Sequence, residues 1–214
     1  EIYFIKEVKN SKRNGTHIFK NVPLKTAKYK AIPNDSLLLE TEFIYPLVKG
    51  PMIKPFNFET NNDYAIFPYE WGIKNSKSIS ELNKTNPRLT EYLLDYKSLI
   101  EQQSERSLDI SIGNEFYSLS KIGDYTFVDC LVAFRDNTTM SACVITPVEM
   151  PWGGKKMPVC AKHAPFISMT KSKRKIGIKE AFYISGVLNT PIVKEYISLS
   201  NDNRSFSIDL TIKL

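Results

Sequence analysis

Apolar and polar residues alternate at the N-terminus in a pattern that predicts a β-hairpin. Ile2 and Phe4 begin a strand over residues 1–9, a turn-rich stretch covers residues 10–15, and residues 16–19 return as the second strand. The next apolar segments are shorter. Residues 37–40 are a short apolar stretch that leads into a loop, and residues 45–51 are predicted to form a compact turn. Residues 64–69 predict an aromatic-rich strand that Pro68 ends.

The strongest helical pattern covers residues 87–105. Pro87 suits the first turn of a helix, and Leu89, Leu93, Tyr96 and Ile100 repeat at intervals of three and four residues. These four side chains would share one face, so the pattern predicts a single scaffold helix that packs against a core.

The second half of the chain alternates short apolar segments with polar loops. Strands are predicted over residues 125–134, 140–148, 166–169 and 205–214, and two short helices over residues 180–189 and 192–198. A turn over residues 135–137 and basic loops over residues 151–156 and 171–175 connect them. Because strands and helices do not alternate regularly, we expect an α+β fold with mainly antiparallel sheets and about three helices.

Length and composition are those of a folded domain. The chain has 214 residues, of which 42% are hydrophobic and 24% charged. We expect one domain over residues 1–214, with residues 1–30 as its N-terminal hairpin. No apolar run approaches the ~20 residues of a membrane span, and there is no signal peptide, so we expect a cytoplasmic protein without membrane contact. Since Glu1 replaces an initiator Met, the chain is expected to be a piece of a longer protein.

The formal charge of +6 is unevenly distributed along the chain. Residues 1–30 hold eight basic and two acidic side chains, whereas residues 31–150 hold ten basic and seventeen acidic ones. Residues 151–178 hold seven basic side chains and no acidic one, and residues 179–214 hold four of each. Segregated positive charge favours binding to a polyanion. The alternative is that these blocks are solvated surface.

Catalytic motifs are missing from the sequence. It has no dinucleotide-binding, phosphate-loop or serine-nucleophile motif. Cys160 and His163 are spaced like metal ligands or a nucleophile with its base, but further ligands and an orienting residue are lacking. The cysteines are odd in number and far apart in the sequence, at Cys130, Cys143 and Cys160, so we expect no disulfide framework. We therefore expect no catalytic residue, no metal site and no enzyme activity of this chain by itself.

Several motifs occur in an order that is known from one family. Glu42 precedes a segment that fits Y-P-L-x-x-G-x-x-I, and an aromatic strand ending in Pro-Tyr, a Tyr-Leu helix and a segment similar to "gilNS" follow. In this sequence they are residues 45–53, 66–69, 92–93 and 185–190. Over residues 37–214 the chain resembles the target-recognition domain of adenine-N6 DNA methyltransferases, including those fused to restriction nucleases. It departs from that pattern at Asn189-Thr190 and in residues 116–119.

The resemblance implies a division of labour within a longer parent chain. A methyltransferase domain with an N-P-P-[YF] catalytic loop and bound S-adenosylmethionine would lie N-terminal to Glu1. The sequence itself has no such loop, since Asn86-Pro87-Arg88 lacks the second proline and the aromatic residue. This chain would then bind double-stranded DNA, hold no cofactor, and partner the methyltransferase domain of the same parent.

The candidate DNA contacts come from the basic segments. The phosphate-contact candidates are Lys155, Lys156, Lys162, Lys171, Lys173, Arg174 and Lys175, which have no acidic neighbour within residues 151–178. Arg135 or Arg174 could donate two hydrogen bonds from its guanidinium to O6 and N7 of a guanine. Trp152 would press on the sugar-phosphate edge or, alternatively, anchor its loop.

Two other functions compete with DNA recognition. The chain could be a protein-interaction or assembly module of a larger complex, with its basic loops as solvated surface. A free-standing nuclease would instead need a cluster of metal-binding carboxylates, which the sequence does not offer: the segments 7–9 and 95–97 that fit E-x-K and D-x-K lack an acidic partner.

Overall fold

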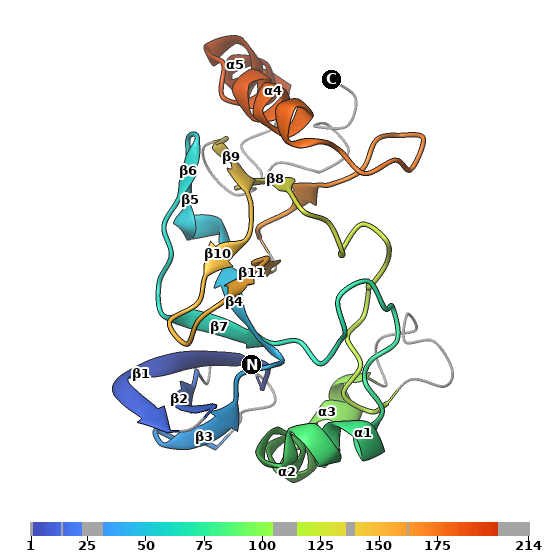
Figure 1. Cartoon of the computed structure of the whole chain (residues 1–214). Helices are drawn as coiled ribbons and strands as arrows, with labels where there is room; N and C mark the ends of the chain where they lie inside the picture. Colours follow the sequence, from blue (N-terminus) through green and yellow to red (C-terminus); the bar gives the residue numbers. More distant parts are fainter. Residues whose placement is uncertain are drawn as a thin grey trace. The chain divides into compact units, whose positions relative to one another are not determined.

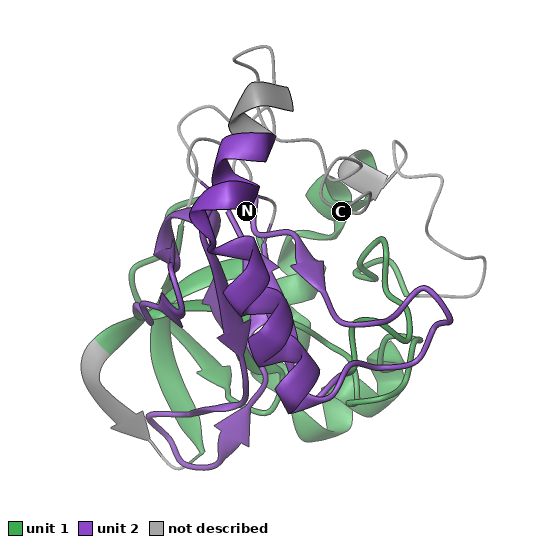
Figure 2. Cartoon of the chain, turned by 90° about the horizontal axis from the view of Figure 1, so that it is seen from above, with its two compact units in different colours: residues 1–45, 62–127 green, residues 46–61, 128–214 purple. Residues whose placement is uncertain are grey.

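The computed structural model describes residues 2–13, 15–22, 32–104, 115–135, 140–161 and 163–200. Within these ranges the chain forms five α-helices and mostly antiparallel strands, so the predicted α+β class is confirmed (Figure 1). The chain divides into two compact units (Figure 2), of which unit 1 comprises residues 1–45 and 62–127 and unit 2 comprises residues 46–61 and 128–214. The first crossing falls inside strand β4 (Ile44–Val48), where no linker-like composition marks it in the sequence.

Unit 1 contains an antiparallel sheet in the order β7-β1-β2-β3. Its strands are β1 (Phe4–Arg13), β2 (Thr16–Asn21), β3 (Leu37–Glu40) and β7 (Asp63–Ile66). The N-terminal hairpin is confirmed, but β1 continues to Arg13 through part of the predicted turn. A register shift between Glu7 and Lys12 absorbs the irregular alternation of this segment, which is why the sequence pattern ends the strand too early.

Three helices belong to unit 1, namely α1 (Ile79–Thr85), α2 (Pro87–Asp95) and α3 (Lys97–Ser104). Figure 1 shows them side by side. The single helix predicted over residues 87–105 is wrong in one respect, because Tyr96 leaves helical geometry (φ −99°, ψ 8°) and separates α2 from α3. Leu89, Leu93 and Ile100 are buried on the predicted face. Helix α1 escaped prediction because Leu82 is its one buried side chain.

The core of unit 1 is rich in tyrosines whose hydroxyl groups bond to backbone carbonyls. Tyr3 donates to Tyr117 O at 2.9 Å, and Tyr117 in turn donates to Lys77 O at 2.6 Å. Tyr92 on α2 donates to Ile2 O at 2.8 Å. These bonds satisfy buried polar groups, and they tie α2 and Tyr117 to the N-terminal segment.

Unit 2 is built on a three-stranded antiparallel sheet in the order β13-β8-β9. The strands are β13 (Phe166–Ile167), β8 (Leu131–Phe134) and β9 (Ala142–Ile145). Helix α4 (Ile178–Leu188) packs against β8 and β9, and α5 (Pro191–Ser200) follows it (Figure 1). Both helices are confirmed to within a few residues of their predicted bounds.

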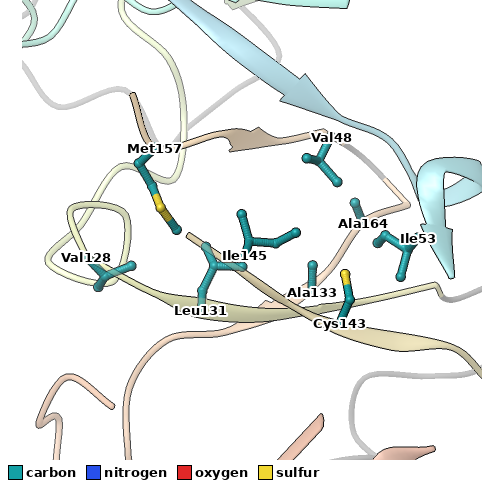
Figure 3. Packing of buried hydrophobic residues seen from close by; sticks show 9 residues of the cluster. All are labelled: Val48, Ile53, Val128, Leu131, Ala133, Cys143, Ile145, Met157 and Ala164. Atoms are coloured by element: carbon teal, nitrogen blue, oxygen red, sulfur yellow. The ribbon is translucent and has the colours of Figure 1, made fainter. Parts of the chain in front are cut away.

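The two faces of this sheet are both apolar. Alternate residues such as Val132, Phe134 and Ala142 pack beneath Ala181 and Leu188 of α4. The residues between them face a second cluster, which Figure 3 shows and which comprises Val48, Ile53, Val128, Leu131, Ala133, Cys143, Ile145, Met157 and Ala164. Burial on both faces explains why these strands are near-continuous apolar runs in the sequence. The strands are shorter than predicted, since β8 begins at Leu131 rather than at Tyr125.

Short elements complete unit 2. Strand β12 (Val159–Cys160) pairs in parallel with β4, while β5 (Ile53–Lys54) and β6 (Asn57–Phe58) form a hairpin after a 3₁₀ turn at Gly50–Met52. The predicted turn over residues 45–51 is therefore wrong for its first half. All five residues of β4 are buried, so the segment lacks the alternation that identifies a half-buried strand. The strand predicted over residues 205–214 lies outside the described residues.

Candidate nucleic-acid interface

The two units differ in charge. Unit 1 holds fifteen basic and fifteen acidic residues, whereas unit 2 holds fourteen basic and eight acidic ones. The net charge of +6 therefore resides on unit 2. The basic block at residues 1–30 gives unit 1 no net charge, because acidic residues of the same unit balance it.

The first group of predicted DNA contacts lies on a β-hairpin, which we call the basic hairpin (residues 148–156). Strands β10 (Val148–Glu149) and β11 (Lys155–Lys156) pair antiparallel. The turn between them places Gly153 and Gly154 at φ +97° and +79°, values that glycine adopts without strain. The amide of Met150 donates to Gly154 O at 2.9 Å, which closes the turn.

The cations of the basic hairpin are partly neutralised. Lys155 Nζ lies 3.3 Å from Glu149 Oε1 across the two strands, and both side chains are mostly exposed. An exposed pair of this kind contributes little stability and exchanges readily with other ions. Lys156 and Trp152 are half-buried. Partial burial agrees with a role of Trp152 in anchoring the turn.

The second group lies on a tight turn, which we call the basic turn (residues 169–175). Met169 and Lys175 form an isolated β-bridge, and Thr170 N donates to Arg174 O at 2.7 Å. Lys173 has a left-handed backbone with φ +62° at the tip. All five residues from Lys171 to Lys175 are exposed, so the loop predicted here is confirmed.

Arg174 forms a bidentate ion pair with Glu180 on α4. Its Nη1 donates to Glu180 Oε2 at 2.9 Å, and its Nη2 donates to Oε1 at 2.6 Å. Glu180 also accepts from the Gly177 amide at 2.7 Å, next to the start of α4. The Arg174 guanidinium, followed by this amide, lowers the pKa of the Glu180 carboxyl to about 2.

These two ion pairs correct one expectation. Lys155 and Arg174 were expected to be without an acidic neighbour, but Glu149 and Glu180 lie just outside the acid-free segment of the sequence and fold back onto it. The Arg174 guanidinium, which was proposed to contact guanine, is already bound to the Glu180 carboxylate. Arg174 must exchange this partner before it can contact DNA.

The remaining candidates differ in their surroundings. Lys171 and Lys173 have no ion-pair partner among the residues that the structure describes, and both are exposed. Lys175 is exposed as well, at the base of the turn. Arg135 is half-buried at the end of β8, and its amide donates to Ser141 O at 3.0 Å. Lys162 lies outside the described residues.

The cysteines are poor candidates for chemistry. Cys130 and Cys143 are buried, and burial raises the pKa of Cys143 and of Cys160 to about 12. A thiol with such a pKa is almost fully protonated at neutral pH and is a weak nucleophile. Among the described residues, no group of three or more His, Cys, Asp or Glu side chains could hold a metal ion.

One residue in each of the motifs at 45–53 and 185–190 has a structural role in this chain. A side chain at Gly50 would overlap the carbonyl oxygen of His163, so this position requires glycine. Asn189 at the end of α4 is buried and bonds to both backbone groups of Ala142, at 3.1 and 2.7 Å. These residues shape the scaffold from which the basic turn and the basic hairpin project.

One surface was missed in the sequence. Helix α4 exposes four large apolar side chains, namely Ile178, Phe182, Tyr183 and Val187. The signal was present, because apolar residues occupy both faces of the helix in residues 178–188.

Over the residues that the structure describes, no helix is both long enough and apolar enough to cross a membrane. No protein-family model matches the chain, and a search of curated proteins finds no similar sequence.

Proposed function

We propose that the chain is a sequence-specific, double-stranded DNA-recognition module of an adenine-specific DNA methyltransferase or restriction-modification enzyme. The observation that carries the proposal is the location of the entire net charge of +6 on unit 2, the unit that presents the basic turn and the basic hairpin. Phosphate contacts supply most of the affinity of a DNA-binding protein, and exposed lysines on projecting turns are suited to make them.

Different cations serve different purposes in this proposal. Lys171 and Lys173 are exposed and lack an ion-pair partner among the described residues, so they contact phosphates without first breaking a bond. Arg174 exchanges the Glu180 carboxylate for a phosphate or for a guanine edge. Until DNA arrives, Glu180 holds the guanidinium in a bidentate ion pair.

The family resemblance supplies the adenine specificity and the parent enzyme. S-adenosylmethionine and the methyl transfer belong to a separate methyltransferase domain of the same parent chain, and this chain positions the target adenine for it. The parent works in the cytoplasm, where it has access to the chromosome.

The salt dependence of duplex binding tests the proposal. The double variant Lys171→Ala/Lys173→Ala should lower affinity and reduce the slope of log K against log salt by about 2, since each lost phosphate contact removes about 0.9. The control is Lys84→Ala/Lys121→Ala in unit 1, because Lys121 also has a left-handed backbone (φ +61°). Equal affinities for the two double variants would refute the site, and absence of duplex binding by the parent would refute the function.

A further inference from the structure

Helix α4 is apolar on two opposite faces. Ala181, Ser185 and Leu188 are buried where the helix packs against the sheet of unit 2. On the other side Phe182 and Tyr183 are 62% and 74% exposed. A helix with apolar residues all round is normally covered on all sides, so the exposed side of α4 is suited to a partner.

Helix α5, which contacts α4, exposes apolar residues as well. Ile192 is 80% exposed, and Tyr196, one turn further along α5, is half exposed. We call the exposed apolar residues of these two helices the outer face of α4–α5; they are Ile178, Phe182, Tyr183, Val187, Ile192 and Tyr196. Exposed aromatic residues of this kind form the energetic centres of protein interfaces.

Gly186 lies in the same row as Ile178 and Phe182, at successive intervals of four residues along α4. A Cβ atom at this position would meet no atom within 4 Å, so the chain's own packing gives no reason for a glycine. Glycine inside a helix costs about 1 kcal/mol relative to alanine. The glycine leaves the helix backbone open to close approach by another chain.

Positive charge gathers at the start of α4. Lys179 is exposed on α4 itself, and Lys171 and Lys173 lie on the basic turn that leads into the helix. Of the nearby carboxylates, Glu180 is already bound to Arg174, while Glu195 is exposed on α5 beside Lys194. The charges at the start of α4 therefore favour an acidic partner.

These features select one class of occupant. A second copy of the chain would bring an equally basic surface against this one, which like charges disfavour. DNA requires hydrogen-bonding side chains to read its bases, and only Tyr183 and Tyr196 among the six residues carry a polar group. An amphipathic protein helix with an acidic polar side satisfies both the apolar and the electrostatic requirement.

We infer that the outer face of α4–α5 binds an acidic amphipathic helix of a partner protein. Phe182 and Tyr183 contact the apolar side of the partner helix, which approaches closely at Gly186. Its carboxylates lie opposite Lys171, Lys173 and Lys179. This interaction goes beyond DNA recognition, because it uses apolar residues that the DNA proposal leaves unused.

The test uses a synthetic helical peptide with Leu and Phe at positions i, i+3, i+4 and i+7 and Glu at the exposed positions. We expect salt-sensitive binding to the full chain, with amide chemical-shift changes confined to α4, α5 and the basic turn. The double variant Phe182→Ala/Tyr183→Ala should weaken binding about tenfold or more, as loss of two interface anchors does. Ile73→Ala, which truncates an exposed apolar residue of unit 1, is the matched control and should bind normally.

Gly186→Leu separates docking from stability. Leucine favours helices over glycine, so this variant should be at least as stable as the wild type yet bind the peptide more weakly. Equal binding of a shuffled peptide or of a Lys-for-Glu peptide would overturn the inference, as would absence of binding.

Other occupants give different results, each of which contradicts the inference. Self-association that Phe182→Ala/Tyr183→Ala abolishes would assign the face to a second copy. Loss of duplex affinity in that variant would assign it to DNA. Tighter peptide binding by a chain shortened at residue 200 would assign it to the chain's own last residues. Failure of the DNA proposal leaves the peptide measurement unaffected, so the two are tested separately.

Discussion

The side chain of Asn189 bonds to both backbone groups of Ala142. Its Oδ1 accepts from the Ala142 amide at 3.1 Å, and its Nδ2 donates to the Ala142 carbonyl at 2.7 Å. Ser185 Oγ donates to the same carbonyl at 3.3 Å, and the amide of Phe56 does so at 2.9 Å. One residue at the start of β9 thus joins the end of α4 to the tip of the β5–β6 hairpin.

Replacing Asn189 should therefore destabilise unit 2. Asn189→Ala removes these bonds and leaves the Ala142 amide without its acceptor, at a cost of about 3 kcal/mol. Urea unfolding should show the loss, whereas Asn83→Ala, at an exposed position of α1, should change stability by less than about 0.5 kcal/mol. Similar unfolding midpoints for the two variants would show that the bonds between Asn189 and Ala142 contribute nothing to stability.

Two glycines should respond in opposite ways to alanine. Gly50→Ala forces a Cβ into the His163 carbonyl oxygen and should cost about 2 kcal/mol, as overpacking does. Gly186→Ala adds its Cβ in open space within a helix and should stabilise the chain by about 1 kcal/mol. Thermal unfolding of both variants measures the contrast, and a stable Gly50→Ala variant would exclude the close approach at His163.

Glu40 caps a helix that is distant from it in sequence. Its carboxylate accepts from the amides of Arg88 and Leu89 at 3.2 and 3.0 Å, in the first turn of α2, where the side chain of Asn86 makes no capping bond. Glu40→Ala should cost about 1 kcal/mol, the usual value of a capping group. Glu91→Ala on the exposed side of α2 is the control in the same unfolding experiment. Equal effects would mean that the capping bonds are not formed in solution.

The Arg174–Glu180 pair makes the start of α4 sensitive to acid. Because the folded state lowers the pKa of Glu180 from 4.5 to about 2, the pair stabilises the fold fully above pH 4.5. The contribution is lost as the pH falls from there through the folded value, and it is small because both groups are exposed. A side-chain NMR titration of Glu180 measures the pKa directly, and an ordinary value would contradict the ion pair.

The same pair has a consequence for the proposed DNA binding. Glu180→Gln removes the charge that holds Arg174, so duplex affinity should increase and the salt slope should steepen by up to about 1. Glu149→Gln, which releases Lys155, should act in the same direction. Unchanged binding in both variants would remove Lys155 and Arg174 from the interface while leaving Lys171 and Lys173 in it.

The thiols of buried Cys143 and half-buried Cys160 should be unreactive in the folded protein. Since burial raises the pKa of Cys143 and Cys160 to about 12, thiolate is almost absent at neutral pH. A thiol-alkylating reagent should label both residues slowly in buffer and rapidly in urea, with mass spectrometry to locate the label. Fast labelling of Cys160 in the folded state would reopen a chemical role for it.

Local patterns in the sequence predicted the elements that depend on local interactions. The N-terminal hairpin, α4, α5 and the exposed basic turn all follow from periodicity, turn residues and charge. Fully buried β4 was missed because a strand that is covered on every side has no polar positions to reveal its alternation. The break at Tyr96 carries no glycine or proline signal either.

The candidate site was harder to predict, because folding brings together charged residues that lie in different segments of the sequence. Glu149 and Glu180 lie outside the acid-free segment, yet the hairpin register and the start of α4 bring them onto Lys155 and Arg174. The balance within unit 1 depends on which segments fold together, which composition alone does not reveal. The crossings between the units decide how the charge is divided.

Those crossings also dictate the order in which the chain can fold. Strand β4 is complete early in synthesis from the N-terminus, but its parallel neighbour β12 is made only after the whole second segment of unit 1. During synthesis, residues 46–61 therefore lack the rest of unit 2 until residues 128–214 have been made. Unit 1, in contrast, is complete once residue 127 has been made. Neither unit can be expressed as one continuous fragment, and a break in the backbone between Tyr45 and Pro46 would separate the two segments of unit 1.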